Sequence, residues 1–152
     1  MAEKPIETLK KMYLATDLGE GAEIVAPADT VWQPMAQRLQ EMIRAHSGES
    51  LPVVSGEDTS VASLNERHWV VLGNAMNNPG LMALYRRKYA FVDDYYPGGD
   101  GYVIRTVHNP ESRGHNVLLV GASTPEGGKA ALDRLEGVLQ DNGKQLGYTN
   151  VA

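Results

Sequence analysis

The chain has 152 residues, and its 14 Lys and Arg against 19 Asp and Glu give a formal net charge of −5. This length suits one domain, and a composition of 42% hydrophobic and 22% charged residues excludes a disordered or fibrous chain. The acidic balance argues against nucleic acid and anionic membranes as partners, because both attract a basic surface. Cysteine is absent, which excludes disulfides, thiolate nucleophiles and Cys-ligated metals.

The domain organisation is read from where the apolar patterning begins and ends. Residues 1–11 are a polar lead with no apolar stretch behind them, so no signal peptide is predicted. No apolar run is long enough to span a membrane. We expect a single domain over residues 12–140, followed by a tail, or a linker to a further domain, over residues 141–152. The compartment stays open at this point.

The first half of the chain predicts strands around one long helix. Short strands are expected over 12–17 and 23–26. Helical spacing then relates five apolar residues, namely Val31, Met35, Leu39, Met42 and Ile43. Asp29 or Thr30 can cap this helix and Gly48 can end it, while Pro34 delays its regular part by about a turn. The β-branched runs at 51–55 and 68–73 predict buried strands.

The second half repeats this alternation. Asn78 followed by Pro79 predicts a helix start, with Leu81, Leu84, Tyr85 and Lys88 on one face. A two-faced strand is expected over 101–107, and a fully buried strand over 116–121. Ser123 and Glu126 form a capping box that opens the last helix.

The predicted element order is β-β-α-β-β-α-β-β-α. Pairs of strands between helices favour an α+β fold: a mixed β-sheet of about five or six strands, with two or three helices packed mainly on one face. The strictly alternating order of a doubly wound nucleotide-binding fold is not present.

The most unusual stretch is residues 93–101, where acidic and aromatic side chains meet glycines and a proline. A sugar ring could stack on Tyr95 or Tyr96 while Asp93 and Asp94 accept its hydroxyl groups. The aspartates could also offer oxygen ligands to calcium, although the glutamate that ends an EF-hand loop is missing. The alternative is a structural turn that opens the next strand.

Two other segments carry candidate binding groups. Arg86 begins a basic cluster that continues to Lys88 and could contact an anionic sugar or a phosphate, or could be a solvated helix face. Residues 121–130 look like a phosphate loop, but Glu126 and Ala130 break the required spacing. The glycines there favour a structural helix start that allows close approach of the backbone.

Catalytic and metal-binding patterns are weak. His108 and His115 flank a predicted hairpin connection, and two histidines without a third ligand are little support for zinc. Neither a G-x-S-x-G nucleophile elbow nor an H-E-x-x-H helix occurs, and neighbouring carboxylates such as Asp93 and Asp94 need not face one substrate from opposite sides. The sequence therefore predicts no catalytic residue, no metal site and no cofactor.

The order of the predicted elements and several short motifs resemble those of a known domain family. The helix at 31–47 runs through a Ser-Gly stop into an LPVV strand, and the motifs VVLGN (70–74), GYVIRT (101–106) and NVLLVGA (116–122) follow it. Together these segments resemble the non-catalytic α+β domain that precedes the catalytic barrel of bacterial glycoside hydrolases. The chain is similar to the second domain of β-N-acetylhexosaminidases and to the N-terminal domain of α-glucuronidases over residues 12–140.

The resemblance implies a mixed sheet with helices on one face, attached to a larger, exported polysaccharide-active enzyme. The catalytic acids of those families lie on the barrel, so none is transferred to this chain. We therefore expect an accessory domain that packs beside a neighbouring catalytic domain of the same polypeptide and helps to shape glycan binding.

Two alternatives belong to other functional classes. One is a free-standing carbohydrate-binding module that uses residues 93–101 on an oligosaccharide. The other is a small metal-dependent enzyme built on His108, His115 and a nearby aspartate.

Overall fold

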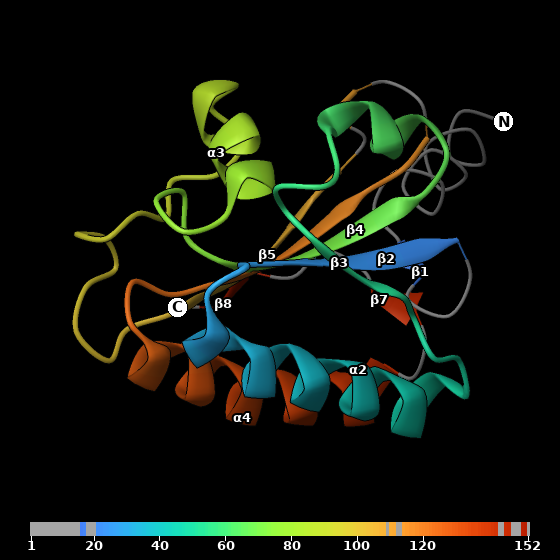
Figure 1. Ribbon diagram of the computed structural model, residues 1–152. Helices are drawn as coiled ribbons and strands as arrows, with labels where there is room; N and C mark the ends of the chain where they lie inside the picture. The colour runs from blue at the N-terminus through green and yellow to red at the C-terminus, as the bar shows by residue number, and fades with distance from the viewer. Residues whose placement is uncertain are drawn as a thin grey trace, which may run out of the picture.

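The computed structural model describes residues 16–17, 21–108, 110–111, 114–142, 145–146 and 150–151. Their framework is a six-stranded mixed sheet with helices on both faces (Figure 1). The strand order is β3-β2-β4-β6-β5-β8, and β3, β2, β4 and β6 run parallel, while β5 is antiparallel to both of its neighbours. The strands are β2 (Ala22–Ala26), β3 (Val53–Ser55), β4 (His68–Gly73), β5 (Val103–Val107), β6 (Val117–Gly121) and β8 (Asn150–Val151).

Two long helices cover one face of this sheet, and shorter helices cover part of the other (Figure 1). The long pair is α2 (Gln33–Ser47), preceded by the 3-10 turn η1 (Thr30–Trp32), and α4 (Pro125–Asn142). The opposite face carries α3 (Pro79–Arg86) and the 3-10 helix η2 (Val61–Asn65). The expected α+β class, with a mixed sheet and most of the helical packing on one face, is confirmed.

Each face of the sheet has its own hydrophobic core, because side chains alternate along a strand. In β4, Val70 and Leu72 point toward α2 and α4, whereas Trp69 and Val71 point toward α3 and η2. The two-faced pattern of β5 divides in the same way: Ile104 enters the first core, and Val103 and Val107 enter the second.

The predicted helix ends are confirmed at several places. The Asp29 carboxylate accepts a hydrogen bond from the N–H of Val31 (3.0 Å), and the regular helix starts at Gln33 with Pro34 in its first turn. Gly48 ends α2 in the left-handed conformation (φ 82°), which favours glycine. Asn78 caps α3, directly before Pro79.

Three expectations differ from the structure. Residues 141–152 are not a tail in their described part: α4 continues to Asn142, β7 (Gln145–Leu146) pairs with β1 (Thr16–Asp17), and β8 joins the main sheet. Leu146 is fully buried, so this region completes the core. The α3 helix ends at Arg86, and Lys88 therefore does not extend its face.

The third difference is the cap of α4. Thr124, and not Ser123, accepts from the helix backbone, because its Oγ1 lies 3.1 Å from the N–H of Gly127. The polar lead at 1–11, and residues 12–15 of the first predicted strand, lie outside the described residues. None of the described helices is both long and apolar enough to cross a membrane.

Candidate functional site

The carboxyl edge of the parallel strands is the first place to look for a ligand site. The chain leaves β2 through α2 on one face of the sheet and leaves β4 through α3 on the other, so the connections diverge at this edge. Ligands of open α/β sheets bind in the crevice that such a divergence creates. Three asparagines, Asn74, Asn77 and Asn78, lie there directly after β4.

The side chains of these asparagines form hydrogen bonds with the backbone. The Asn78 amide donates to the carbonyls of Val25 (3.1 Å) and Leu72 (2.8 Å), and its oxygen accepts from the N–H of Gly80 (3.0 Å). The Asn74 amide donates to the carbonyl of Ala122 (3.1 Å), and its oxygen accepts from two backbone N–H groups of the following turn. Their polar atoms are engaged in fixing loops, so the edge is built for stability.

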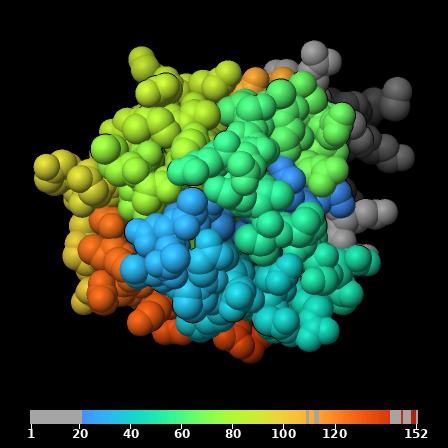
Figure 2. Space-filling model, viewed as in Figure 1, coloured from blue at the N-terminus to red at the C-terminus, as the bar shows by residue number. Residues whose placement is uncertain are grey.

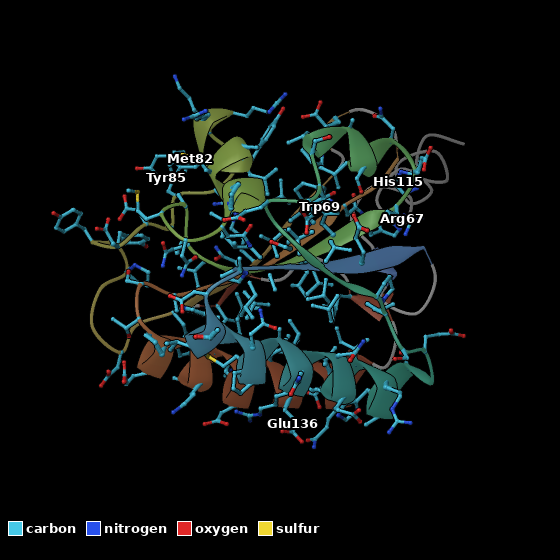
Figure 3. The ribbon with its side chains drawn as sticks, viewed as in Figure 1. Arg67, Trp69, Met82, Tyr85, His115 and Glu136 are labelled. Carbon is cyan, nitrogen blue, oxygen red and sulfur yellow. The ribbon has the colours of Figure 1, made fainter. Side chains whose placement is uncertain are left out.

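Asp93 stabilises the segment that connects α3 to β5 through hydrogen bonds within that segment and to α3. One carboxylate oxygen accepts from the backbone N–H groups of Tyr95 (2.9 Å) and Tyr96 (2.8 Å). The other accepts from the hydroxyl of Tyr85 on α3 (3.0 Å). Figure 3 places Tyr85 on the side of α3 that faces this segment. The Asp93 carboxylate is therefore a structural anchor.

The start of α4 holds the same segment from below. The Ser123 hydroxyl donates to the carbonyl of Asp93 (2.6 Å) and accepts from the N–H of Gly98 (3.0 Å). The Thr124 hydroxyl donates to the carbonyl of Gly99 (2.6 Å). Although the segment stands out as a yellow lobe on the left of Figure 2, its backbone is tied to the start of α4 at several points.

The anchor makes the segment sensitive to acid. The N–H groups of Tyr96 and Tyr95 hold the pKa of the Asp93 carboxyl below its ordinary value, and the Tyr85 hydroxyl adds to this effect. Because the pKa of this carboxyl is lower in the folded than in the unfolded chain, its ionised form stabilises the fold at pH values above the unfolded pKa of about 4. This stabilisation is lost as pH falls through the lower pKa of the folded chain. We expect the amide signals of Tyr95 and Tyr96 to shift as pH falls below about 4, when the Asp93 carboxylate takes up a proton.

Two variants distinguish protonation of Asp93 from protonation of other carboxyl groups in the chain. Asp93→Asn removes the acid transition of those amides, and it also lowers the pKa of Tyr85, which the hydrogen bond to Asp93 now raises. An ultraviolet titration of the phenols follows the second change. Asp94→Asn keeps the acid transition, because no described hydrogen bond joins Asp94 to these amides. A transition that persists in Asp93→Asn contradicts the assignment.

Three large aromatic side chains are exposed on this segment: Phe91 (51%), Tyr95 (86%) and Tyr96 (55%). Phe91 and Tyr96 line a pocket of about 290 Å³ on the α3 side of the sheet. Its floor comes from β5 and β6, and its far wall from β8. The full lining is Phe91, Val92, Tyr96, Val103, Arg105, Leu119 and Asn150. We call this the aromatic pocket.

Arg105 gives the aromatic pocket its charge. It lies on β5 between Val103 and Val107, on the face whose other side chains are buried, and Asn150 of β8 is its register partner. The half-buried guanidinium donates to the carbonyl of Tyr89 (3.1 Å). Within the described ranges it forms no ion pair.

The structure brings only part of the predicted site together. Tyr96 lines the aromatic pocket, whereas Tyr95 and Asp94 are exposed outside it and the Asp93 carboxylate is occupied. Arg86 lines a different pocket of about 330 Å³, beside Met76 and Met82. Its neighbour Arg87 pairs with Glu111 (3.2 Å).

Sequence reasoning missed Phe91, Arg105 and Asn150. One signal was available for Arg105, since a charged residue alternates there with valines on a face predicted to be buried. Asn150 carried no such signal, because its strand is two residues long.

The other sequence candidates have structural roles or stay separate. The glycines of the loop before α4 allow close packing: a Cβ on Gly128 would lie 2.8 Å from both Met35 Sδ and Trp32 Cζ3. His115 packs edge-on against His68, with ring centroids 5.0 Å apart, at the end of the sheet away from the aromatic pocket (Figure 3). Among the described residues, no three metal-ligating side chains gather.

One buried carboxylate lies on β2. Glu23 on β2 is 6% exposed and accepts from the indole N–H of Trp69 (3.0 Å) and from the hydroxyl of Ser63. Arg67 lies 3.7 Å from its other oxygen. Because Ser63 belongs to η2, the cluster fastens η2 to the sheet, and Figure 3 shows Trp69 and Arg67 on this side of the sheet. The cluster lines neither of the pockets described above.

No protein-family model matches the chain, and no curated protein matches it significantly.

Proposed function

We propose that this chain is a non-catalytic accessory domain of a larger, glycoside hydrolase-like protein, and that it contacts glycan at the aromatic pocket. The observation that carries the proposal is the pair of half-exposed rings, Phe91 and Tyr96, set beside the Arg105 guanidinium in one small concavity. An aromatic face offers apolar contact to the C–H face of a sugar, and polar groups at the rim fix its orientation.

Strand β8 sets where a catalytic domain attached after this chain would lie. Asn150 belongs to this last strand and lines the aromatic pocket, so a polypeptide that continues past Val151 leaves the domain close to the pocket. A catalytic neighbour attached there would have the pocket at the border of its cleft. The domain would then extend the glycan-binding surface without supplying catalytic acids.

A binding titration tests the glycan contact. Calorimetry of the chain with neutral and uronic-acid oligosaccharides is expected to give binding that Tyr96→Ala weakens about tenfold or more, as for a central aromatic anchor. Tyr95→Ala is the matched control, because it removes the same side chain from the same segment outside the pocket. We expect its binding to change by less than about threefold.

The same samples test the absence of catalysis. After prolonged incubation, mass spectrometry is expected to find the oligosaccharides uncleaved. Absence of binding across the panel, equal effects of the two tyrosine variants, or cleavage that copurifies with the chain each contradicts the proposal.

A further inference from the structure

We infer that the aromatic pocket selects acidic sugars, with the carboxylate of a uronic acid bound by Arg105 and the sugar ring held against Tyr96. This inference rests on the proposed function, because it takes for granted that a sugar occupies the pocket. It adds the chemical class of the ligand and the residue that reads it.

The Arg105 guanidinium has no carboxylate partner among the described residues. Burial takes water away from a cation, and a carboxylate partner offsets that cost. Arg38, Arg67 and Arg87 each lie within 4.0 Å of a carboxylate. Arg105 is half-buried in a pocket, yet in the described part of the chain it has a backbone carbonyl and no carboxylate. An anionic ligand group would supply the missing partner.

The unused donors of Arg105 have the geometry that a carboxylate needs. The hydrogen bond from Nη2 to the Tyr89 carbonyl uses one of the five guanidinium N–H groups and holds the side chain in place. The remaining donors keep the planar fork that matches both oxygens of a carboxylate. Asn150, the register partner of Arg105, adds an amide that can bond a ring hydroxyl. A carboxylate attached to a polyhydroxylated ring therefore fits the groups that line this pocket.

The net charge of the chain does not attract an acidic sugar from a distance. The chain carries a net charge of −5, and the neighbouring segment contains Asp93, Asp94 and Asp100, so the overall field repels anions. Attraction of an acidic sugar must then come from a short-range contact with Arg105. Removal of a cation elsewhere should leave acidic-sugar binding unchanged, whereas a field effect would make all cations equivalent.

The experiment compares one sugar in two charge states. The chain is titrated with trigalacturonic acid, with its neutral methyl ester, and with acetate alone. We expect the acid to bind about tenfold or more tightly than the ester, which is typical of a hydrogen-bonded charged pair. Acetate, which has the carboxylate and no ring, should neither bind measurably nor compete.

Substitutions of arginine test whether Arg105 causes the preference for the acid over the ester. Arg105→Gln should abolish the difference between acid and ester, and Arg105→Lys, which keeps the charge and loses the fork, should retain only part of it. Arg86→Gln is the matched control: it makes the same change of charge in the other pocket and should leave the difference intact. If Arg105→Gln does not fold, Arg105→Lys alone carries the comparison.

The outcomes separate the inference from the proposed function. Equal binding of acid and ester, with Tyr96 still required, overturns the acidic-sugar inference and leaves glycan binding standing. Equal effects of Arg86→Gln and Arg105→Gln, or competition by acetate as strong as by the trisaccharide, also overturn it. Absence of binding by every saccharide overturns both.

Discussion

Asn78→Ala is expected to lower the free energy of unfolding by about 3 kcal/mol, because it strands three backbone groups at once. Asn78 is fully buried and bonds the carbonyls of Val25 and Leu72 and the N–H of Gly80. It therefore joins the ends of β2 and β4 to the first turn of α3. The amide also packs closely against Gly56, where an added Cβ would overlap the Asn78 oxygen.

Chemical denaturation measures this loss, and a thermal melt should move by roughly 6 to 12 °C for a chain of this length. Asn77→Ala is the control in the same turn: its side-chain oxygen accepts one backbone bond, from Asn74 (2.9 Å), and it is only half-buried. We expect that variant to lose about 1 kcal/mol. Equal losses in the two variants would contradict the role of Asn78 as a three-way link.

Gly127→Ala is expected to destabilise the chain by about 1 to 2 kcal/mol, although alanine is the better helix former. A Cβ at this position of α4 would collide with the carbonyl oxygen of Gly101 and approach Ala122 Cβ to 3.1 Å. Because the obstacle is backbone, the loop that carries Tyr96 must move. We therefore also expect weaker glycan binding in this variant.

The same substitution at Gly137 should have the opposite sign. Gly137 lies in the same helix, and the nearest atom to an added Cβ would be Arg134 Nη1 at 3.7 Å, an ordinary contact. Gly137→Ala is expected to stabilise the fold by about 0.5 to 1 kcal/mol through helix propensity alone. Denaturation of both variants side by side separates packing from propensity. Stabilisation by Gly127→Ala would show that the loop adapts freely.

Local signals in the sequence predict most of this fold. The stripe from Met35 to Ile43, the Gly48 stop and the Asn78 cap each act through residues close in the chain, so they are readable without the structure. The strands β7 and β8 are not readable in this way, because two residues carry no periodicity. Their positions depend on pairing with β1 and β5, far away in the sequence.

The candidate site is predictable in composition and unpredictable in geometry. The sequence singles out Asp93 and Tyr96, but the same carboxylate can receive a ligand or brace its own turn, and here it braces the turn. Arg86 and Arg105 are equally plausible as cations, and only the fold decides which one shares a pocket with Tyr96. The pocket draws on the segment after α3 and on three strands, so no contiguous motif encodes it.

The measurement that tests glycan binding at the aromatic pocket most directly is a backbone-amide NMR titration of the whole chain with trigalacturonic acid. We predict that the signals of Phe91, Tyr96, Arg105 and Asn150 move together and saturate with a single binding constant. The signals of Met76 and Arg86, which line the other pocket, should stay in place. Saturating shifts centred on Met76 and Arg86, or no saturating shifts at all, would contradict the account.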